Sequence, residues 1–269
     1  MSTRSIRELV SLEGRVALVT GAAGHVGRVF AETLAELGAR VVILDLDASG
    51  CADVATSLED SWGVDAMPCP LDLADPKAVG SVPGQVLERF SQLDILVHCA
   101  ALVGTASMEG WATDFEGQSM AHWPDALQVN LTAPVALTQA CANSLKLSGH
   151  GSVINVGSHL GIVGPDWQIY EGSNFSTPAA YAASKGGLVQ MTRWLATTLA
   201  PDVRVNAISP GGIRRDQQDS FIDKYSQRTP LGRMANEDDL RGALAFLASD
   251  LSAYVTGQNL IVDGGYTAW

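Results

Sequence analysis

The sequence of 269 residues contains only four cysteines and no hydrophobic run long enough to span a membrane. Cys51, Cys69, Cys99 and Cys141 are scattered and lack the paired spacing of metal ligands. We therefore expect reduced thiols that are buried or half-buried, and no metal site. The N-terminal residues also lack the apolar core of a secretory signal, which favours a cytoplasmic protein.

Basic residues are scarce as well. Lysine and arginine number 17 against 29 aspartates and glutamates, which gives a formal net charge of −12. Because phosphate backbones bind basic surfaces, this balance argues against nucleic acid as a partner. With 46% hydrophobic and 17% charged residues, the chain is long enough for one large domain over residues 1–269 with a substantial core.

Short apolar runs alternate with helical stretches along the chain, which is typical of a parallel sheet covered on both faces. The fold class we expect is α/β, a single doubly wound Rossmann-type domain with a seven-stranded parallel sheet. Strands are predicted near residues 15–20, 40–46, 65–71, 93–98, 151–157, 203–208 and 258–262, and the longest helices near 121–147 and 178–200.

Three segments fall outside this alternation, at residues 102–123, 159–179 and 212–236. Each follows the carboxyl end of a predicted strand, where open α/β sheets bind their ligands. We therefore expect all three to wall a substrate site, and the segment 212–236 to form a lid.

The first predicted strand leads into a glycine-rich turn, Gly21-Ala-Ala-Gly24-His25-Val26-Gly27, and then an amphipathic stretch to Leu37. Strand, glycine turn and helix in this order open a dinucleotide-binding unit, because the backbone can approach a pyrophosphate and the helix start offers N–H groups. Asp45 ends the second predicted strand, near the spacing at which an acidic residue meets the adenosine ribose. A glycine turn without a ligand is the alternative.

Asp45 also bears on the choice between NAD and NADP. A 2′-phosphate about 4 Å from its carboxylate would be repelled by roughly 4 kcal/mol at an effective dielectric of about 20. Neither Ala22 nor Ala23 supplies a cation. We expect NAD to be preferred, and Arg28 and Arg40 are the residues that would explain the opposite result.

Tyr181 and Lys185 lie four residues apart, so on a helix they share one face. A free tyrosine has a pKa of about 10. A fixed cation beside it lowers that pKa, so the pair would form a tuned proton donor or acceptor. The same spacing also arises by chance on solvated helices.

These features resemble the short-chain dehydrogenase/reductase family over nearly the whole chain, from about Leu12 onward. The family's glycine motif fits Thr20, Gly21 and Gly27, but His25 stands at its middle glycine and Gly24 one place earlier. The remaining matches are Asp72 in Leu71-Asp-Leu73, the looser His98-Cys99-Ala100-Ala101, Asn130 in Val129-Asn-Leu131, Ser158 in Ile154-Asn-Val-Gly-Ser158, Pro210-Gly211-Gly212 and the tail from Tyr254 to Gly265.

The resemblance implies an NAD(P)-dependent oxidoreductase acting on CH–OH groups. Tyr181 would exchange a proton with the substrate oxygen, Ser158 would donate a hydrogen bond to that oxygen, and Lys185 would bind the nicotinamide ribose. Asn130 would hold a water on the proton path, or serve a structural role in a helix kink. The cofactor-binding residues implied are Gly21, Gly24, His25, Val26, Gly27, Asp45, Asp72, Leu73, Ala100, Tyr181, Lys185, Pro210, Gly211 and Ile213.

The connection from Ser158 to Tyr181 is longer than in many family members and contains Tyr170. Tyr170 lacks a lysine four residues on, so we interpret it as a pocket residue. With Trp111, Trp123 and Trp167 it would offer flat apolar faces of the kind that stack on sugar rings. The alternative is that these aromatic residues anchor the insertions to the body of the protein.

The substrate is less closely defined. The sequence resembles reductases of bacterial surface-sugar and nonulosonic-acid pathways in His25, the long Ser158–Tyr181 connection and Pro210-Gly-Gly-Ile213. This resemblance predicts a sugar or sugar phosphate as the substrate. Reductases of 3-oxoacyl groups and polyol dehydrogenases share the same core motifs. A catalytically silent NAD-binding subunit and an epimerase are further alternatives.

Two predictions concern partners. Arg214, Arg215 and Arg228 lie in the predicted lid of an otherwise acidic chain, which favours a small anionic substrate. The helix after Tyr181 carries small residues followed by apolar ones, and in this family the corresponding helix packs against a symmetry mate. We therefore expect a homodimer or homotetramer.

Overall fold

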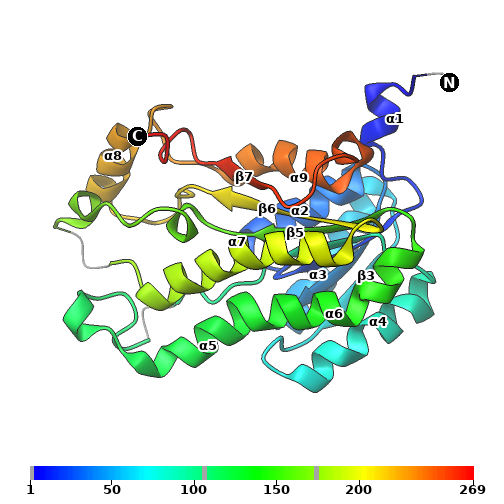
Figure 1. The fold of residues 1–269 in the computed structure, drawn as a ribbon, viewed down its shortest axis with the longest axis horizontal. Helices are drawn as coiled ribbons and strands as arrows, with labels where there is room; N and C mark the ends of the chain where they lie inside the picture. Colours follow the sequence, from blue (N-terminus) through cyan, green and yellow to red (C-terminus); the bar gives the residue numbers. More distant parts are fainter. Residues whose placement is uncertain (1–2, 105–107, 173–175) are drawn as a thin grey trace.

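The computed structural model describes residues 3–104, 108–172 and 176–269. Seven parallel strands form one sheet in the order β3-β2-β1-β4-β5-β6-β7 (Figure 1). Their bounds are β1 Val16–Thr20, β2 Arg40–Asp45, β3 Ala66–Pro70, β4 Ile95–His98, β5 Gly151–Val156, β6 Val203–Pro210 and β7 Asn259–Val262. The predicted parallel sheet is confirmed, and the strand order changes direction between β1 and β4, the position at which such sheets bind ligands.

Helices cover both faces of the sheet. The α-helices of the described residues are α1 Ile6–Val10, α2 His25–Glu36, α3 Ala48–Trp62, α4 Pro76–Phe90, α5 Trp123–Leu127, α6 Ala133–Leu147, α7 Ala179–Leu199, α8 Asp219–Arg228 and α9 Arg241–Ala248. Alternate residues of a strand point to opposite faces, so Ala17 and Val19 pack with α2, α3 and α9, whereas Val16 and Leu18 pack with α4, α6 and α7. Two separate hydrophobic cores result.

The predicted long helix near 121–147 is wrong in one respect, because it is not continuous. A π-helical turn, η3 Gln128–Thr132, separates α5 from α6. Pro134 has no N–H group, so the bond it would donate to the carbonyl of Asn130 in an α-helix cannot form. The interruption therefore falls at the predicted site residue Asn130. The second long helix is confirmed as α7.

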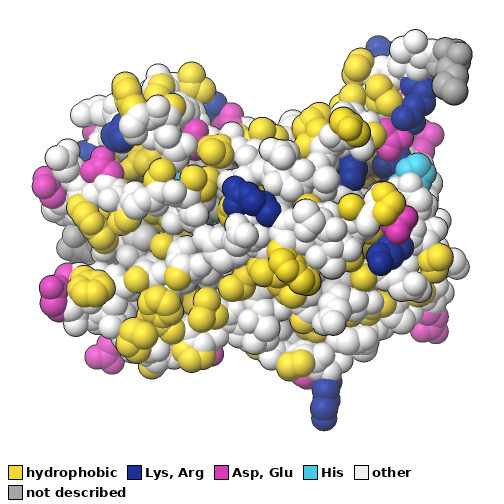
Figure 2. All heavy atoms as spheres, viewed as in Figure 1, with side chains coloured by type: hydrophobic (Ala, Val, Ile, Leu, Met, Phe, Trp, Pro, Cys, Tyr) yellow, Lys and Arg dark blue, Asp and Glu magenta, His cyan; other side chains and the backbone are white. Residues whose placement is uncertain are grey.

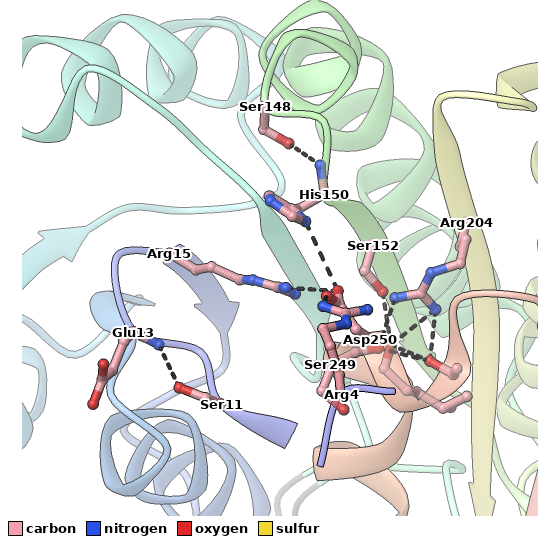
Figure 3. Close-up of polar contacts among 12 residues, drawn as sticks. Arg4, Ser11, Glu13, Arg15, Ser148, His150, Ser152, Arg204, Ser249 and Asp250 are labelled. Carbon is pink, nitrogen blue, oxygen red and sulfur yellow. Dashed lines mark hydrogen bonds and ion pairs between the residues drawn. The ribbon is translucent and has the colours of Figure 1, made fainter. Parts of the chain in front are cut away.

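Hydrogen bonds and ion pairs hold neighbouring segments together at the amino-terminal ends of the strands, opposite the carboxyl ends where ligands bind. Asp250, in the 3₁₀ turn η7 Asp250–Ser252, accepts hydrogen bonds from Arg4 at 2.7 Å and Arg15 at 2.6 Å (Figure 3). Arg204 at the start of β6 donates to Ser252 Oγ at 2.8 Å. This network joins the N-terminal residues, β1 and β6, and leaves the carboxyl edge for function.

Two further observations complete the fold. No helix in the described ranges is both long and apolar enough to cross a lipid bilayer. The four cysteines are free thiols, of which Cys99 is half-buried and the other three are buried.

Candidate active site

The turn between β1 and α2 depends on glycine. Gly21 has a φ of +67°, and a Cβ atom there would lie 2.6 Å from the Cα of Ala100. A Cβ atom at Gly27 would lie 2.0 Å from the carbonyl oxygen of Gly21. Gly24 precedes α2 and offers no side chain to cap it, so the first N–H groups of α2 are available to an anion.

A cleft of about 570 Å³ opens beside this turn, along the carboxyl ends of β1 to β4. Predicted residues that line it are Gly21, Gly24, His25, Val26, Gly27, Asp45, Asp72, Leu73 and Ala100. Residues that line it without having been predicted as cofactor contacts are Leu44, Leu46, Leu71, Cys99, Ala101, Leu102, Val103, Val129 and Arg215. Most of these additional lining residues are neighbours in sequence of a motif residue. That neighbourhood was the only feature of the sequence that could have identified them.

Asp45 is held in the wall of this cleft by the backbone. Its Oδ2 accepts from the N–H of Ala23 at 3.0 Å, and its Oδ1 from the N–H of Asp47 at 3.2 Å. A carboxylate fixed at the end of β2 retains lone pairs for further donors, such as ribose hydroxyls. The glycine turn, the free helix end and this carboxylate together fit an adenine dinucleotide.

Tyr181, Lys185 and Ser158 are brought together by α7 and the end of β5. Ser158 precedes the 3₁₀ turn η4 His159–Gly161, and its hydroxyl accepts from the N–H of Leu160 at 3.2 Å. A Cβ atom at Gly161 would lie 2.7 Å from the carbonyl carbon of Lys185, so η4 packs closely on α7. This packing places the Ser158 side chain near Tyr181, close enough to lower the pKa of the phenol against the larger effect of burial.

Burial controls the protonation of the Tyr181–Lys185 pair. It raises the pKa of Tyr181 to about 12, against the opposing effect of the hydrogen bond with Ser158. It lowers the pKa of Lys185 to about 8. Nζ of Lys185 lies 5.7 Å from the Tyr181 ring centroid and donates to the carbonyl of Val156 at 2.7 Å.

Burial dominates the pKa of Tyr181 in this structure, and the lowering effect expected of Lys185 stays a prediction. Loss of solvation of the phenolate outweighs an ammonium group that is directed at a carbonyl. The phenol of Tyr181 is neutral at physiological pH and carries a proton that it can donate.

Asn130 is 1% exposed, and its side chain bonds to the loop after β4 and to α7. Oδ1 accepts from the N–H of Leu102 at 2.6 Å, while Nδ2 donates to the carbonyl of Leu102 at 3.1 Å and to Ser184 Oγ at 3.0 Å. Both Nδ2 hydrogens are engaged. These contacts support the structural role of Asn130, and its role in a proton path stays a prediction.

The strand β6 lies beside β5 and ends at Pro210, and Gly211 and Ile213 come directly after this end. Gly211 donates to the carbonyl of Val262 at 2.9 Å, and Ile213 forms a bridge with Ala235. They lie outside the lining of the cleft described above. The structure places them next to the strand that carries Ser158, which is compatible with the predicted nicotinamide side.

His159 was missed by sequence reasoning. It is buried beside Ser158, with its ring edge-on to Tyr225 and Tyr266 at centroid distances of 6.2 and 5.2 Å. Its Nδ1 lies 3.3 Å from the carbonyl of Pro210. It therefore links the end of β5 to the end of β6, and only its position after Ser158 could have drawn attention to it.

The aromatic residues of the insertions divide into two groups. Trp111 is 4% exposed, donates to the carbonyl of Val103 at 2.8 Å and packs in a cluster with Trp123 and Tyr181. Trp111 therefore anchors the segment 102–123 to the body of the protein. Its buried ring does not form the flat pocket face that we expected. Trp167 is 54% exposed and lies 5.9 Å from Tyr170, centroid to centroid. The segments 102–123 and 159–179 extend partly outside the described residues.

The three predicted lid arginines differ in their surroundings. Arg215 lines the cleft, and its Nη2 lies 2.5 Å from Oε1 of Glu237. Arg228 pairs with Asp166 at 3.3 Å and lies over the rings of Tyr266 and Trp269. The side chain of Arg214 is exposed. In the described part of the chain, no group of three or more His, Cys, Asp or Glu side chains is arranged to hold a metal ion.

Comparison with known proteins agrees with this geometry. A family profile described as enoyl-(acyl carrier protein) reductase matches residues 21–267. The chain belongs to the short-chain dehydrogenase/reductase family, a family of nucleotide-binding oxidoreductases that act on alcohol and ketone groups.

Two curated relatives are similar over almost their whole length. One is cis-4-hydroxycyclohexanecarboxylate dehydrogenase of Sinomonas cyclohexanicum, 35% identical over 263 residues, or 94% of this chain and 97% of that protein. The other is 3-oxoacyl-(acyl-carrier-protein) reductase of Escherichia coli K12, 31% identical over 261 residues, or 95% and 98%.

A solved structure shows the same fold. Gluconate 5-dehydrogenase from Burkholderia cenocepacia J2315, in complex with NADP and tartrate, superposes with a TM-score of 0.86 at 30% identity. The match covers 98% of this chain and 100% of that one.

Proposed function

We propose that the protein is an NAD-dependent oxidoreductase that interconverts a secondary alcohol and a ketone on a small hydroxycarboxylate, such as a sugar acid. The observation that carries the proposal is the grouping of Ser158, Tyr181 and Lys185, with Nζ of Lys185 at 5.7 Å from the Tyr181 ring centroid, beside a cleft that fits a dinucleotide. Two of the three similar proteins are named for carboxylate substrates.

Each residue of this group has one role in the proposal. Tyr181 donates its proton to the substrate oxygen in the direction of reduction and recovers it in the direction of oxidation. Ser158 donates a hydrogen bond to the same oxygen and stabilises the charge that develops there. Lys185 keeps a positive charge near both groups. The bound nicotinamide would supply or accept the hydride.

Asp45 supports NAD as the cofactor. Its carboxylate is fixed at the cleft wall, where a 2′-phosphate at about 4 Å would be repelled by roughly 4 kcal/mol at an effective dielectric of about 20. Among the residues that line the described cleft, His25 and Arg215 are the cationic candidates, and both belong to other elements than β2.

The segment 212–236 is the lid of the proposed site, within one catalytic domain. Arg214 and Arg228 are the candidates in it for binding a carboxylate or phosphate of the substrate, since Arg presents a planar fork to such groups. The alternative substrates are a 3-oxoacyl group, a polyol or a surface sugar. Each would react by the same hydride and proton transfers.

The test is a screen of sugar acids, other hydroxycarboxylates, polyols and sugar phosphates with NAD and NADP, followed by the absorbance of the reduced cofactor. We expect a hydroxycarboxylate to be the best substrate, and NAD to be favoured at least tenfold in kcat/KM. Asp45→Asn should reduce that preference, and Asp47→Asn, at an exposed neighbour, should not. Better turnover with NADP would refute the role of Asp45. Absence of net turnover with every substrate would favour a sensor or an epimerase instead.

A further inference from the structure

The helix that carries Tyr181 begins without a cap of its own. It starts at Ala179, so Tyr181 lies in the first turn of α7. The first N–H groups of a helix have no partner within it and must be satisfied from outside. The residue before α7 is Pro178, whose side chain makes no capping hydrogen bond. The order of this first turn therefore depends on contacts from other parts of the chain.

Gln118 supplies such a contact, although it lies 61 residues before Ala179. Its Oε1 accepts from the N–H of Ala179 at 2.9 Å. Its Nε2 donates to the carbonyl of Thr177 at 3.2 Å and to the carbonyl of Thr113 at 3.3 Å. These partners define the orientation of the amide, because an N–H group only donates and a carbonyl oxygen only accepts. Gln118 therefore caps α7 and holds the chain that leads into it.

The segment that carries Gln118 is itself anchored to the protein. Gln118 directly follows the 3₁₀ turn η1 Phe115–Gly117. Trp111 of the same segment is buried in an apolar cluster with Ala180 of α7, and Tyr181 packs against this cluster. The segment 102–123 therefore contacts the first turn of α7 both through the amide of Gln118 and through apolar side chains.

The other members of the candidate active site do not depend on this cap. Lys185 lies in the second turn of α7, and its Nζ donates to the carbonyl of Val156 at 2.7 Å. Ser158 follows β5. Disorder in the first turn of α7 would therefore displace Tyr181 relative to both residues. Because proton transfer requires groups at hydrogen-bond distance, a small displacement of the phenol slows it.

We infer that Gln118 is a positioning residue for Tyr181, which it serves by capping the first turn of α7. The inference rests on the proposed function, because it assumes that Tyr181 donates the proton to the substrate. Gln118 acts through the backbone of α7 and not on the substrate. Its removal should therefore slow proton transfer and leave the binding of NADH unchanged.

The test is steady-state reduction by Gln118→Met, with NADH and the oxo acid that corresponds to the best hydroxycarboxylate of the screen. Methionine is of similar length and lacks the amide. We expect kcat to fall about tenfold or more, with KM and the Kd for NADH within about twofold of the wild type. The ratio of kcat in H₂O to kcat in D₂O should rise, because proton transfer then limits the rate more strongly. Gln190→Met, at an exposed glutamine of α7 that accepts from Arg193 at 3.3 Å, should match the wild type.

The same substitution in Tyr181→Phe separates positioning from a general loss of structure. If Gln118 acts through Tyr181, Gln118→Met should change kcat by less than about twofold in that background, because the two effects are not additive. Titration with NADH gives the folded fraction of each variant, to which kcat is referred. Wild-type kcat in Gln118→Met, or the same loss again in the Tyr181→Phe background, would overturn the positioning role. Undiminished turnover by Tyr181→Phe, or no turnover by the wild type, would overturn the proposed function instead.

Discussion

At the scale of single residues, burial has opposite effects on two neighbouring ionisable groups. It disfavours the charged form of each, so the pKa of Tyr181 rises to about 12 while that of Lys185 falls to about 8. Near pH 7 both groups are therefore protonated, so the phenol is neutral and the ammonium group is charged. A neutral phenol in contact with Ser158 suits the donation of a proton to a carbonyl oxygen.

Burial of His98 makes the stability of the protein depend on pH. Its Nε2 lies 2.8 Å from Thr138 Oγ1 at the end of β4, and burial lowers its pKa from 6.5 to about 3. Between these values the unfolded chain binds a proton that the folded chain does not, so stability is lost as the pH falls. We expect His98 to account for a loss of about 2 kcal/mol between pH 7 and pH 5.

Urea unfolding at both pH values tests this expectation. His98→Asn should lack that part of the loss, while His122→Asn, whose ring contacts the carbonyl of Glu109, should keep the wild-type difference. An equal pH dependence in wild type and His98→Asn would contradict this expectation, because it would show that the folded protein binds a proton at His98 as readily as the unfolded chain does.

At the scale of elements, the π-helical turn η3 joins three parts of the site. Asn130 in this turn bonds the loop after β4 through Leu102 and bonds α7 through Ser184. Asn130→Ala would leave these partners without their hydrogen bonds in a buried place, at a cost of about 3 kcal/mol in the free energy of unfolding. Asn143→Ala, on the exposed side of α6, should cost less than about 0.5 kcal/mol. A loss below about 1 kcal/mol for Asn130→Ala would contradict the joining role.

The elements differ in how far the sequence could predict them. The seven strands follow from short apolar runs such as Val41-Val-Ile-Leu44, because residues buried on both faces need no alternation. The π-helical turn at Asn130 did not follow, since one additional residue leaves the hydrophobic pattern almost unchanged. Pro134 was the only local sign of it.

The candidate active site could likewise be predicted only in part from the sequence. Its residue types and spacing predicted the glycine turn at Gly21–Gly27 and the shared helix face of Tyr181 and Lys185. The protonation state of Tyr181 and the partner of Arg215 could not be predicted, because both depend on burial and on Val156 and Glu237, which are distant in sequence.

At the scale of the whole molecule, charge is unevenly distributed. Figure 2 shows that the face formed by α5, α6 and α7 carries mostly hydrophobic and uncharged polar atoms and few charged side chains. Leu188 and Leu195 on α7 point into the core, but Trp194 is 55% exposed on the same helix. An apolar surface of this kind on a chain of charge −12 favours association with a second copy.

We expect light scattering at micromolar concentration to give the mass of a dimer or tetramer. Trp194→Arg should shift the protein toward the monomer, because a charge would be buried in the interface. Trp62→Arg, at a partly exposed tryptophan on α3, should leave the mass unchanged. A wild-type monomer would refute the association.

The central claim is that Tyr181 supplies the proton for NADH-dependent reduction. The direct measurement is steady-state turnover of the best substrate by Tyr181→Phe and Tyr170→Phe, together with the Kd for NADH. Tyr181→Phe should lower kcat/KM by about a thousandfold, or about 4 kcal/mol, with the Kd for NADH nearly unchanged. Tyr170→Phe should stay within a few-fold of the wild type. Turnover retained by Tyr181→Phe, or lost instead in Tyr170→Phe, would contradict the assignment.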